Sequence, residues 1–146
     1  MWKPTTEKEL SGLKEVGSQR MSFESIDDII GSDELCALLG DWARTWHEED
    51  RPLGVVGAWP AWNGVAIVWA LLTDEIIDRP LSLCKGAHRW MDYIVKRENI
   101  HRLQTLVQPE HDAAQRWAHW LGFQREGLME RASPQGTDLW LYARIF

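Results

Sequence analysis

The chain has 146 residues, a length that suits one domain with a buried core. Hydrophobic residues make up 45% and charged residues 26%, which excludes a disordered tail, a collagen-like fibre and a low-complexity linker. The formal net charge is −6, so the chain lacks the basic character of proteins that bind the phosphate backbone of nucleic acids. We therefore expect a single domain over residues 1–146 and no nucleic-acid partner.

Metal, disulfide and membrane signals are weak. Cys36 and Cys84 and the five histidines form no spacing typical of a metal site or a disulfide framework. The first residues lack the basic and then apolar run of a signal peptide. No apolar stretch reaches the ~18 residues needed to cross a bilayer. The sequence therefore predicts a soluble protein of a reducing compartment, with no metal and no membrane contact.

The first forty residues are the most polar part of the chain. Trp2–Thr5 is a candidate strand. Thr6 and Glu9 have the spacing of a capping box, which predicts a helix over residues 7–15. Two more short helices are expected over residues 25–30 and 32–39, because a glycine follows each of them.

Three strands are expected in the middle of the chain, over residues 41–47, 53–59 and 65–72. The last two are separated by a break that contains Asn63-Gly64, a pair that tolerates the positive φ of a hairpin turn. Both faces of the segment 65–72 are apolar. This pattern predicts a central strand that is covered on both sides.

The second half alternates helices and strands. Pro80 and Pro109 each suit the first turn of a helix; the first helix should end near residue 98, and the second at Gly122, with Trp117 and Trp120 on its inner side. Strands are expected over residues 103–107, 123–130 and 139–145. This order predicts an α/β (α+β) fold with a mixed sheet.

Short motifs within this order resemble a known family. Val107-x-x-x-His111-x-x-Ala114 is followed by Leu121-Gly122-Phe123, and residues 138–142 match a closing strand. These features resemble the GNAT superfamily of N-acetyltransferases over about residues 41–146. The resemblance implies a mixed, mostly antiparallel central sheet flanked by helices. It also implies transfer of an acetyl group from acetyl-CoA to an amine substrate.

A second set of phrases is similar to a divergent phage type within that superfamily. These phrases are Pro52-Leu53, Gly57, Ala66-Ile67-Val68-Trp69 and Leu71-Leu72-Thr73. They resemble the small internal virion protein of short-tailed phages. The alternative hypothesis is therefore a catalytically silent virion or assembly protein that contacts phage structural proteins. Its location would be the cytoplasm of an infected bacterium, or the virion itself.

The resemblance also implies where acetyl-CoA would bind. The family holds the diphosphate on backbone N–H groups at the helix that follows the central strand. The glycine pattern of the family is not clean between residues 74 and 87, and Asp74, Glu75 and Asp78 add negative charge there. The residues that would form a reduced anion site are Leu72, Arg79, Leu81, Ser82, Cys84 and Lys85.

Two residues are candidates for catalysis. His111 stands at the family's asparagine position, and its pKa range suits proton transfer near neutrality, whereas the family's tyrosine position is Ala118. A histidine near a helix start is the alternative interpretation of His111. Glu75 is a candidate base, with a solvated turn as its alternative.

The hairpin at Asn63-Gly64 carries a candidate contact site for a partner. Trp59 and Trp62 flank its tip, and an exposed tryptophan at a loop tip suits a binding surface. We expect at least one of the two to be packed in the core.

Overall fold

The computed structural model describes residues 1–15, 19–20 and 40–146. The helices predicted over residues 25–30 and 32–39 lie outside these ranges. In chain order the elements are β1 (Trp2–Thr5), α1 (Glu7–Glu15), β2 (Gln19–Arg20), β3 (Gly40–Glu48), β4 (Arg51–Trp62), β5 (Val65–Leu72), α3 (Asp74–Ile77), α4 (Pro80–Arg97), β6 (Arg102–Val107), α5 (Asp112–Trp120), β7 (Gln124–Met129) and β8 (Leu139–Ile145).

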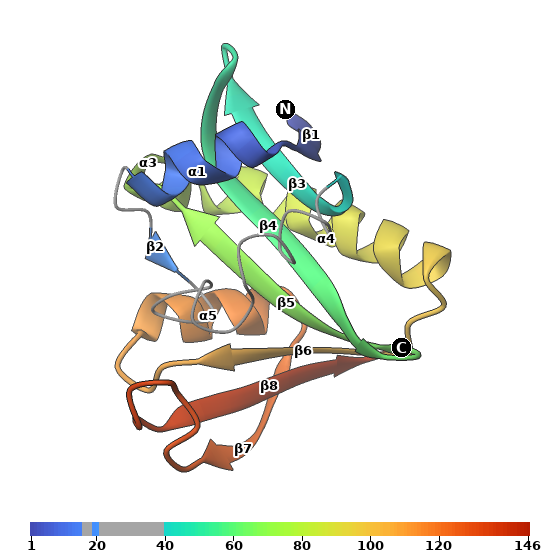
Figure 1. The fold of residues 1–146 in the computed structure, drawn as a ribbon, viewed down its shortest axis with the longest axis vertical. Helices are drawn as coiled ribbons and strands as arrows, with labels where there is room; N and C mark the ends of the chain where they lie inside the picture. Colours follow the sequence, from blue (N-terminus) through green and yellow to red (C-terminus); the bar gives the residue numbers. More distant parts are fainter. Residues whose placement is uncertain (16–18, 21–39) are drawn as a thin grey trace.

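The strands form one twisted sheet in the order β1-β3-β4-β5-β6-β8-β7, and β2 pairs with β5 (Figure 1). The β5–β6 pair is parallel, and the other pairs are antiparallel. The predicted mixed, mostly antiparallel sheet is confirmed. A parallel neighbour for β5 requires a crossover, which α3 and α4 supply.

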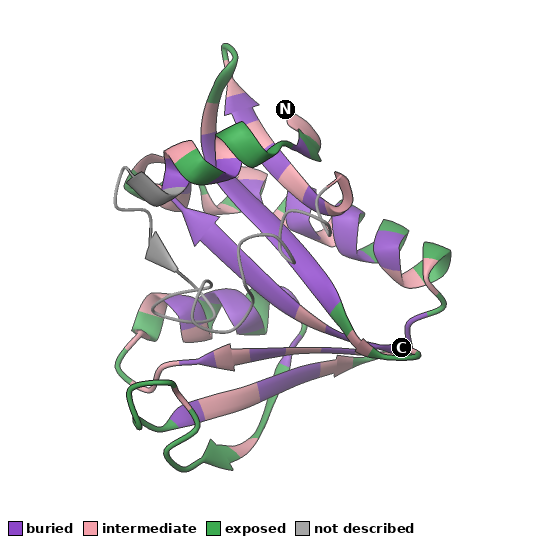
Figure 2. Ribbon diagram, viewed as in Figure 1, coloured by how far each residue is buried: buried purple, intermediate pink, exposed green. Residues whose placement is uncertain are grey.

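Helices cover both faces of the sheet. On one face, Val68 and Leu72 of β5 join a core cluster with α4 and α5. On the other face, Trp69 and Leu71 pack with residues of β4 and α1. Figure 2 shows β5 buried along nearly its whole length. The predicted strand with two covered faces is therefore confirmed.

The capping box of α1 forms as predicted. The Thr6 N–H donates to Glu9 Oε2 at 3.0 Å, and the Glu9 N–H donates to Thr6 Oγ1 at 3.4 Å. The other carboxylate oxygen, Glu9 Oε1, lies 2.6 Å from Nε2 of the buried His47 on β3. One carboxylate therefore caps α1 and also ties this helix to the sheet.

Three details of the second half differ from the sequence prediction. Pro109 lies in a turn closed by the His111 N–H and the Gln108 carbonyl, so α5 begins at Asp112. Trp120 is 55% exposed, because Ala114, Trp117 and Ala118 form the buried side of α5. The single-turn helix α3 was not predicted; it places Ile76 in the core.

The prediction for the two hairpin tryptophans is confirmed. Trp59 is buried at 8% exposure, whereas Trp62 at the hairpin tip is 68% exposed. Trp69, Trp90 and Trp117 are all buried. The many tryptophans therefore build the core and also leave indole rings at the surface.

None of the helices within residues 1–15 and 40–146 has the length and hydrophobicity needed to cross a membrane. Over the described ranges, no group of three or more His, Cys, Asp or Glu residues is placed to hold a metal ion.

Candidate functional site

The two parallel strands β5 and β6 separate partway along their length. Their pairing covers Val65–Ile67 and Arg102–Gln104, whereas β5 continues to Leu72 and β6 to Val107. Just beyond the last pair, Thr105 Oγ1 donates to the Val68 carbonyl at 3.0 Å. The strands therefore open as a wedge toward their C-terminal ends (Figure 1).

Side chains fill most of this wedge. The cavity left inside it has a volume of about 20 Å³, which is room for about one water molecule. The main side chains around it are those of Val68, Thr105, Val107, Ala114, Trp117 and Phe123. In this structure the interior of the wedge is therefore narrow and apolar.

A second pocket, of about 120 Å³, lies at the mouth of the wedge. It is formed by the start of α4 and by Ala113, Arg116, Trp117 and Trp120 of α5. Trp117 lines both the inner cavity and this outer pocket. Its buried indole therefore forms the wall between the two.

The start of α4 lines this outer pocket with Pro80 and Leu83, and its first backbone N–H groups have no partner within the helix. The first bond of the helix joins the Leu83 N–H to the Arg79 carbonyl at 3.2 Å, and no side chain caps the helix at Arg79. The N–H groups of Leu81 and Ser82 precede this bond, so the helix itself provides no acceptor for them. Together with the helix dipole, these donors favour an anion.

The predicted ligand Arg79 and the predicted base Glu75 belong to one ion-pair cluster. Arg51 donates to both Glu75 oxygens, at 2.7 and 2.9 Å, and Arg79 pairs with Glu48 and with Glu75. The hydrogen bond from Arg51 is the main cause of a lowered pKa of Glu75. This environment favours the ionised carboxylate but weakens it as a base, because a general base works best with a pKa near the operating pH.

The other predicted donor-site residues fall on both sides of the α4 start. Of these residues, Leu72 lines the outer pocket, whereas Leu81 is 77% exposed and Lys85 is exposed. Burial raises the pKa of the Cys84 thiol, and a contact with the Trp117 indole opposes that effect. Cys84 is therefore a poor nucleophile beside the wedge.

His111 caps α5. Its Nδ1 accepts a hydrogen bond from the Ala114 N–H at 3.2 Å, which requires Nδ1 to be unprotonated and leaves the ring proton on Nε2. Ala114 itself lines the inner cavity of the wedge. His111 therefore has a structural role, and its Nε2–H can also donate a hydrogen bond near the end of β6.

Strand β2 occupies the free edge of β5. Gln19 pairs with Leu72 and Arg20 with Leu71. Because β4 pairs along the whole opposite edge of β5, β2 lies on the edge that β6 leaves. The sequence analysis missed this feature, since a pair of residues shows no strand periodicity.

The sequence analysis did not assign two further residues of the outer pocket to the donor site. Arg116 and Trp120 are exposed and four residues apart on α5, so they share one face of the helix. The Arg116 guanidinium makes no hydrogen bond or ion pair with the residues that the structure describes. Their spacing of four residues could have indicated a shared exposed face, but Trp120 was predicted to lie on the inner side of the helix.

Comparisons with known proteins establish the fold. No protein-family model matches the chain. A segment of 56 residues, 38% of this chain, is 30% identical to the uncharacterized N-acetyltransferase YnaD of Bacillus subtilis; the match covers 33% of that protein.

Solved structures match over nearly the whole chain. A GNAT-family acetyltransferase from Streptococcus pneumoniae has a TM-score of 0.74 at 18% identity, covering 100% of this chain and 98% of that one. RimL, an alpha-N-protein acetyltransferase of a ribosomal protein in complex with coenzyme A, has a TM-score of 0.72 at 15% identity, covering 99% and 93%. The chain therefore has the fold of the GNAT acetyltransferases.

Proposed function

We propose that the chain is a GNAT N-acetyltransferase that transfers an acetyl group from acetyl-CoA to a primary amine. The observation that carries the proposal is the parallel β5–β6 pair that opens as a wedge onto the uncapped start of α4. The relatives support it, because each of those named above is described as an acetyltransferase, and one is described in complex with coenzyme A.

The donor would bind at the outer pocket. The Leu81 and Ser82 N–H groups would donate hydrogen bonds to its diphosphate, and Arg116 would add positive charge from α5. The exposed Trp120 indole offers a flat apolar face to the adenine ring. Arg79 contributes less than expected, because Glu48 and Glu75 already bind its guanidinium.

Acetyl-CoA would supply the acetyl group as a thioester. In the transfer, the amine nitrogen forms a bond to the acetyl carbon, the carbon–sulfur bond breaks, the amine loses a proton and the sulfur gains one. To protonate the sulfur, His111 would first take up a proton on Nδ1 and give up its hydrogen bond from the Ala114 N–H, and the imidazolium would then donate its Nε2 proton. Backbone N–H groups on the wedge edge of β5, between Val68 and Leu72, would stabilise the acetyl oxygen. Glu75 remains the predicted base.

The alternative function is a catalytically silent phage assembly protein. Two observations favour a silent protein. Side chains leave only a narrow cavity inside the wedge, and β2 pairs with Leu71 and Leu72; both features reduce the space that a donor would need. The relatives named above do not support it, since each is described as an acetyltransferase. Mass spectrometry of phage particles would test it directly.

Thermal unfolding with and without acetyl-CoA tests the proposed function. A ligand at ~100-fold its Kd stabilises the folded state by about 2.7 kcal/mol. We expect Arg116→Gln to reduce that shift and Arg89→Gln, an exposed arginine elsewhere on α4, to leave it unchanged.

The transfer itself is measured as release of free thiol from acetyl-CoA. Peptides with a free N-terminal amine are the first acceptors to test, because RimL is described as acting on the alpha-amine of a ribosomal protein. Absence of both a thermal shift and thiol release, at millimolar acetyl-CoA, would contradict the proposal.

A further inference from the structure

A second opening lies on the flank of α4, away from the wedge. It is a groove of about 610 Å³ between α4 and the strands β1 and β3. Its side chains are Trp2, Arg44, Trp46, Arg89, Trp90 and Tyr93. Arg89 lies nine residues after Pro80, which is roughly 14 Å along the helix axis. The groove is therefore separate from the proposed donor pocket.

The aromatic walls of the groove are fixed by specific contacts. The Trp2 indole rests on Gly86 so closely that a Cβ added there would lie 1.5 Å from Nε1. Trp2 and Trp46 meet edge to face, with ring centroids 5.5 Å apart. Gly86 lies within residues 74–87, where the family's glycine pattern was sought, but in the structure it provides the surface on which the Trp2 indole packs.

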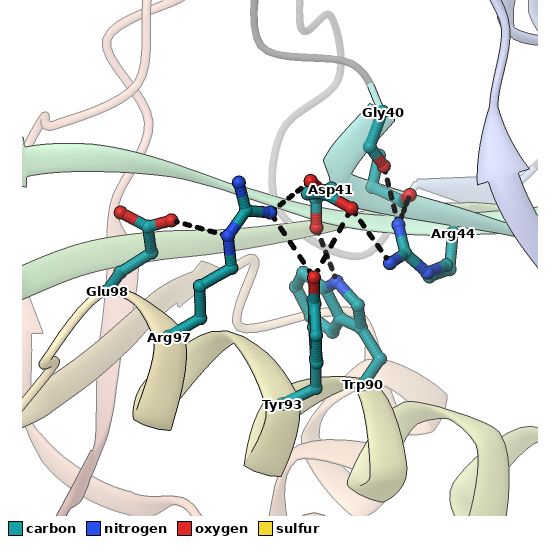
Figure 3. Close-up of polar contacts among 8 residues, drawn as sticks. Gly40, Asp41, Arg44, Trp90, Tyr93, Arg97 and Glu98 are labelled. Atoms are coloured by element: carbon teal, nitrogen blue, oxygen red, sulfur yellow. Dashed lines mark hydrogen bonds and ion pairs between the residues drawn. The ribbon is translucent and has the colours of Figure 1, made fainter.

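Asp41 holds the remaining rings in place (Figure 3). Its carbonyl accepts from Trp90 Nε1 at 3.4 Å, and its carboxylate accepts from the Tyr93 hydroxyl at 3.4 Å. Arg97 also pairs with this carboxylate. Partial burial raises the pKa of Asp41, but the hydrogen bonds from Arg97 and Arg44 outweigh it, and the pKa is lowered.

The charge of the groove is positive. Arg44 is held by the Gly40 and Ala43 carbonyls at 2.6 and 2.9 Å and by Asp41 at 3.3 Å, and its guanidinium lies over the Tyr93 ring (Figure 3). Arg89 is exposed and has no hydrogen bond or ion pair within the described part of the chain. No carboxylate lines the groove as described, so the charge of Arg89 is left without compensation.

The polar groups of the groove are mostly donors. The Nε1 atoms of Trp2 and Trp46 are buried, and that of Trp2 lies against Gly86, so neither faces the open volume of the groove. The Trp90 Nε1 already donates to the Asp41 carbonyl. The exposed Arg89 guanidinium is therefore the donor that a ligand in the groove would meet, and it favours an acceptor such as a carboxylate.

We propose that the groove binds a small planar aromatic carboxylate. The aromatic body of the ligand would lie against Trp46, Trp90 and Tyr93, and its carboxylate would pair with Arg89. The size of the groove is within the range of small-molecule sites, ~300–1,000 Å³. A cationic aromatic ligand is disfavoured, because the uncompensated charge of Arg89 repels it.

Isothermal titration calorimetry of the whole chain with 2-naphthoate tests this site. The neutral 2-naphthamide and the cationic 2-naphthylmethylammonium are the matched ligands of similar shape. Arg89→Gln removes the uncompensated charge, and Arg116→Gln removes an equally exposed arginine on α5 as the control. Circular dichroism confirms that both variants are folded.

We expect saturable binding of one 2-naphthoate per chain, weakened about tenfold by Arg89→Gln and unchanged by Arg116→Gln. We expect 2-naphthamide to bind more weakly and to be insensitive to Arg89→Gln. Absence of saturable binding at about 5 mM, equal binding of the cation, or equal loss in both variants would overturn the proposal. Because the ligand is not acetyl-CoA, the result is independent of the proposed transferase activity.

Discussion

The two openings beside α4 are built in opposite ways. The wedge results from backbone geometry, because two parallel strands separate and a helix starts at their ends. The groove on the flank of α4 results from side chains, mainly tryptophans seated on Gly86 and Asp41. Side chains that include Trp117 nearly fill the wedge, and β2 pairs with the edge of β5 beside it. The groove, by contrast, is open.

This difference explains why the fold is recognisable while its site residues are not. Strand separation and a helix start tolerate many side chains, so the wedge persists without a glycine pattern. The groove depends on particular rings and charges, and a change in one of them alters it. Changes at the wedge and at the groove should therefore have distinguishable effects.

The largest effect is expected from Trp117→Ala. The indole is 7% exposed and separates the inner cavity from the outer pocket, so its removal joins them. Truncation of a buried tryptophan costs about 3–5 kcal/mol of unfolding free energy. Denaturant unfolding measures this loss of free energy. Trp120→Ala, at an exposed position, is the control, and we expect it to change the free energy of unfolding by about 0.5 kcal/mol or less. Similar losses in both variants would contradict the described packing.

A smaller effect is expected at the groove, from Gly86→Ala. The new methyl group would overlap the Trp2 indole, and overpacking of this kind costs about 1–3 kcal/mol. Gly12→Ala on α1 is the control, because no atom lies within 4 Å of its Cβ position; there the change should stabilise the helix by about 0.5–1 kcal/mol. If Gly86→Ala and Gly12→Ala changed the free energy of unfolding in the same direction, the close contact of Trp2 with Gly86 would be ruled out.

The sequence predicts the elements that have a strong local signal. β5 was placed correctly because its two apolar faces follow from eight consecutive residues, and the capping box fixed the start of α1. α3 and β2 were missed, because one turn of helix and a pair of residues carry no periodicity.

The candidate site was harder to predict than the fold. The backbone donors at the start of α4 follow from Pro80 and are present. The ion pairs that bind Arg79 come from β3 and α3, and the ring that needs Gly86 comes from β1. The contacts of Arg79 with Glu48 and of Gly86 with Trp2 join residues far apart in sequence, so one sequence alone does not reveal them.

His111 allows its structural and chemical roles at the wedge to be separated. His111→Ala removes the cap of α5 and should cost about 1 kcal/mol. His111→Asn keeps an acceptor for the Ala114 N–H, but an amide cannot release a proton near neutral pH as a protonated imidazole can. We expect Asn to restore stability but not the rate of thiol release. If Asn restores both, His111 is a capping residue only.

The smallest effect is expected where β2 meets the wedge. If acetyl-CoA follows the free edge of β5, it competes with β2 for the backbone groups near Leu71 and Leu72. Arg20→Pro removes a backbone N–H and disfavours the pairing, and each backbone hydrogen bond contributes about 0.5–1.5 kcal/mol. Acetyl-CoA should therefore bind about two- to tenfold more tightly to this variant, as measured by calorimetry. The groove is remote from β2, so the affinity for 2-naphthoate should stay the same; unchanged or weaker acetyl-CoA binding would show that β2 and the donor do not compete.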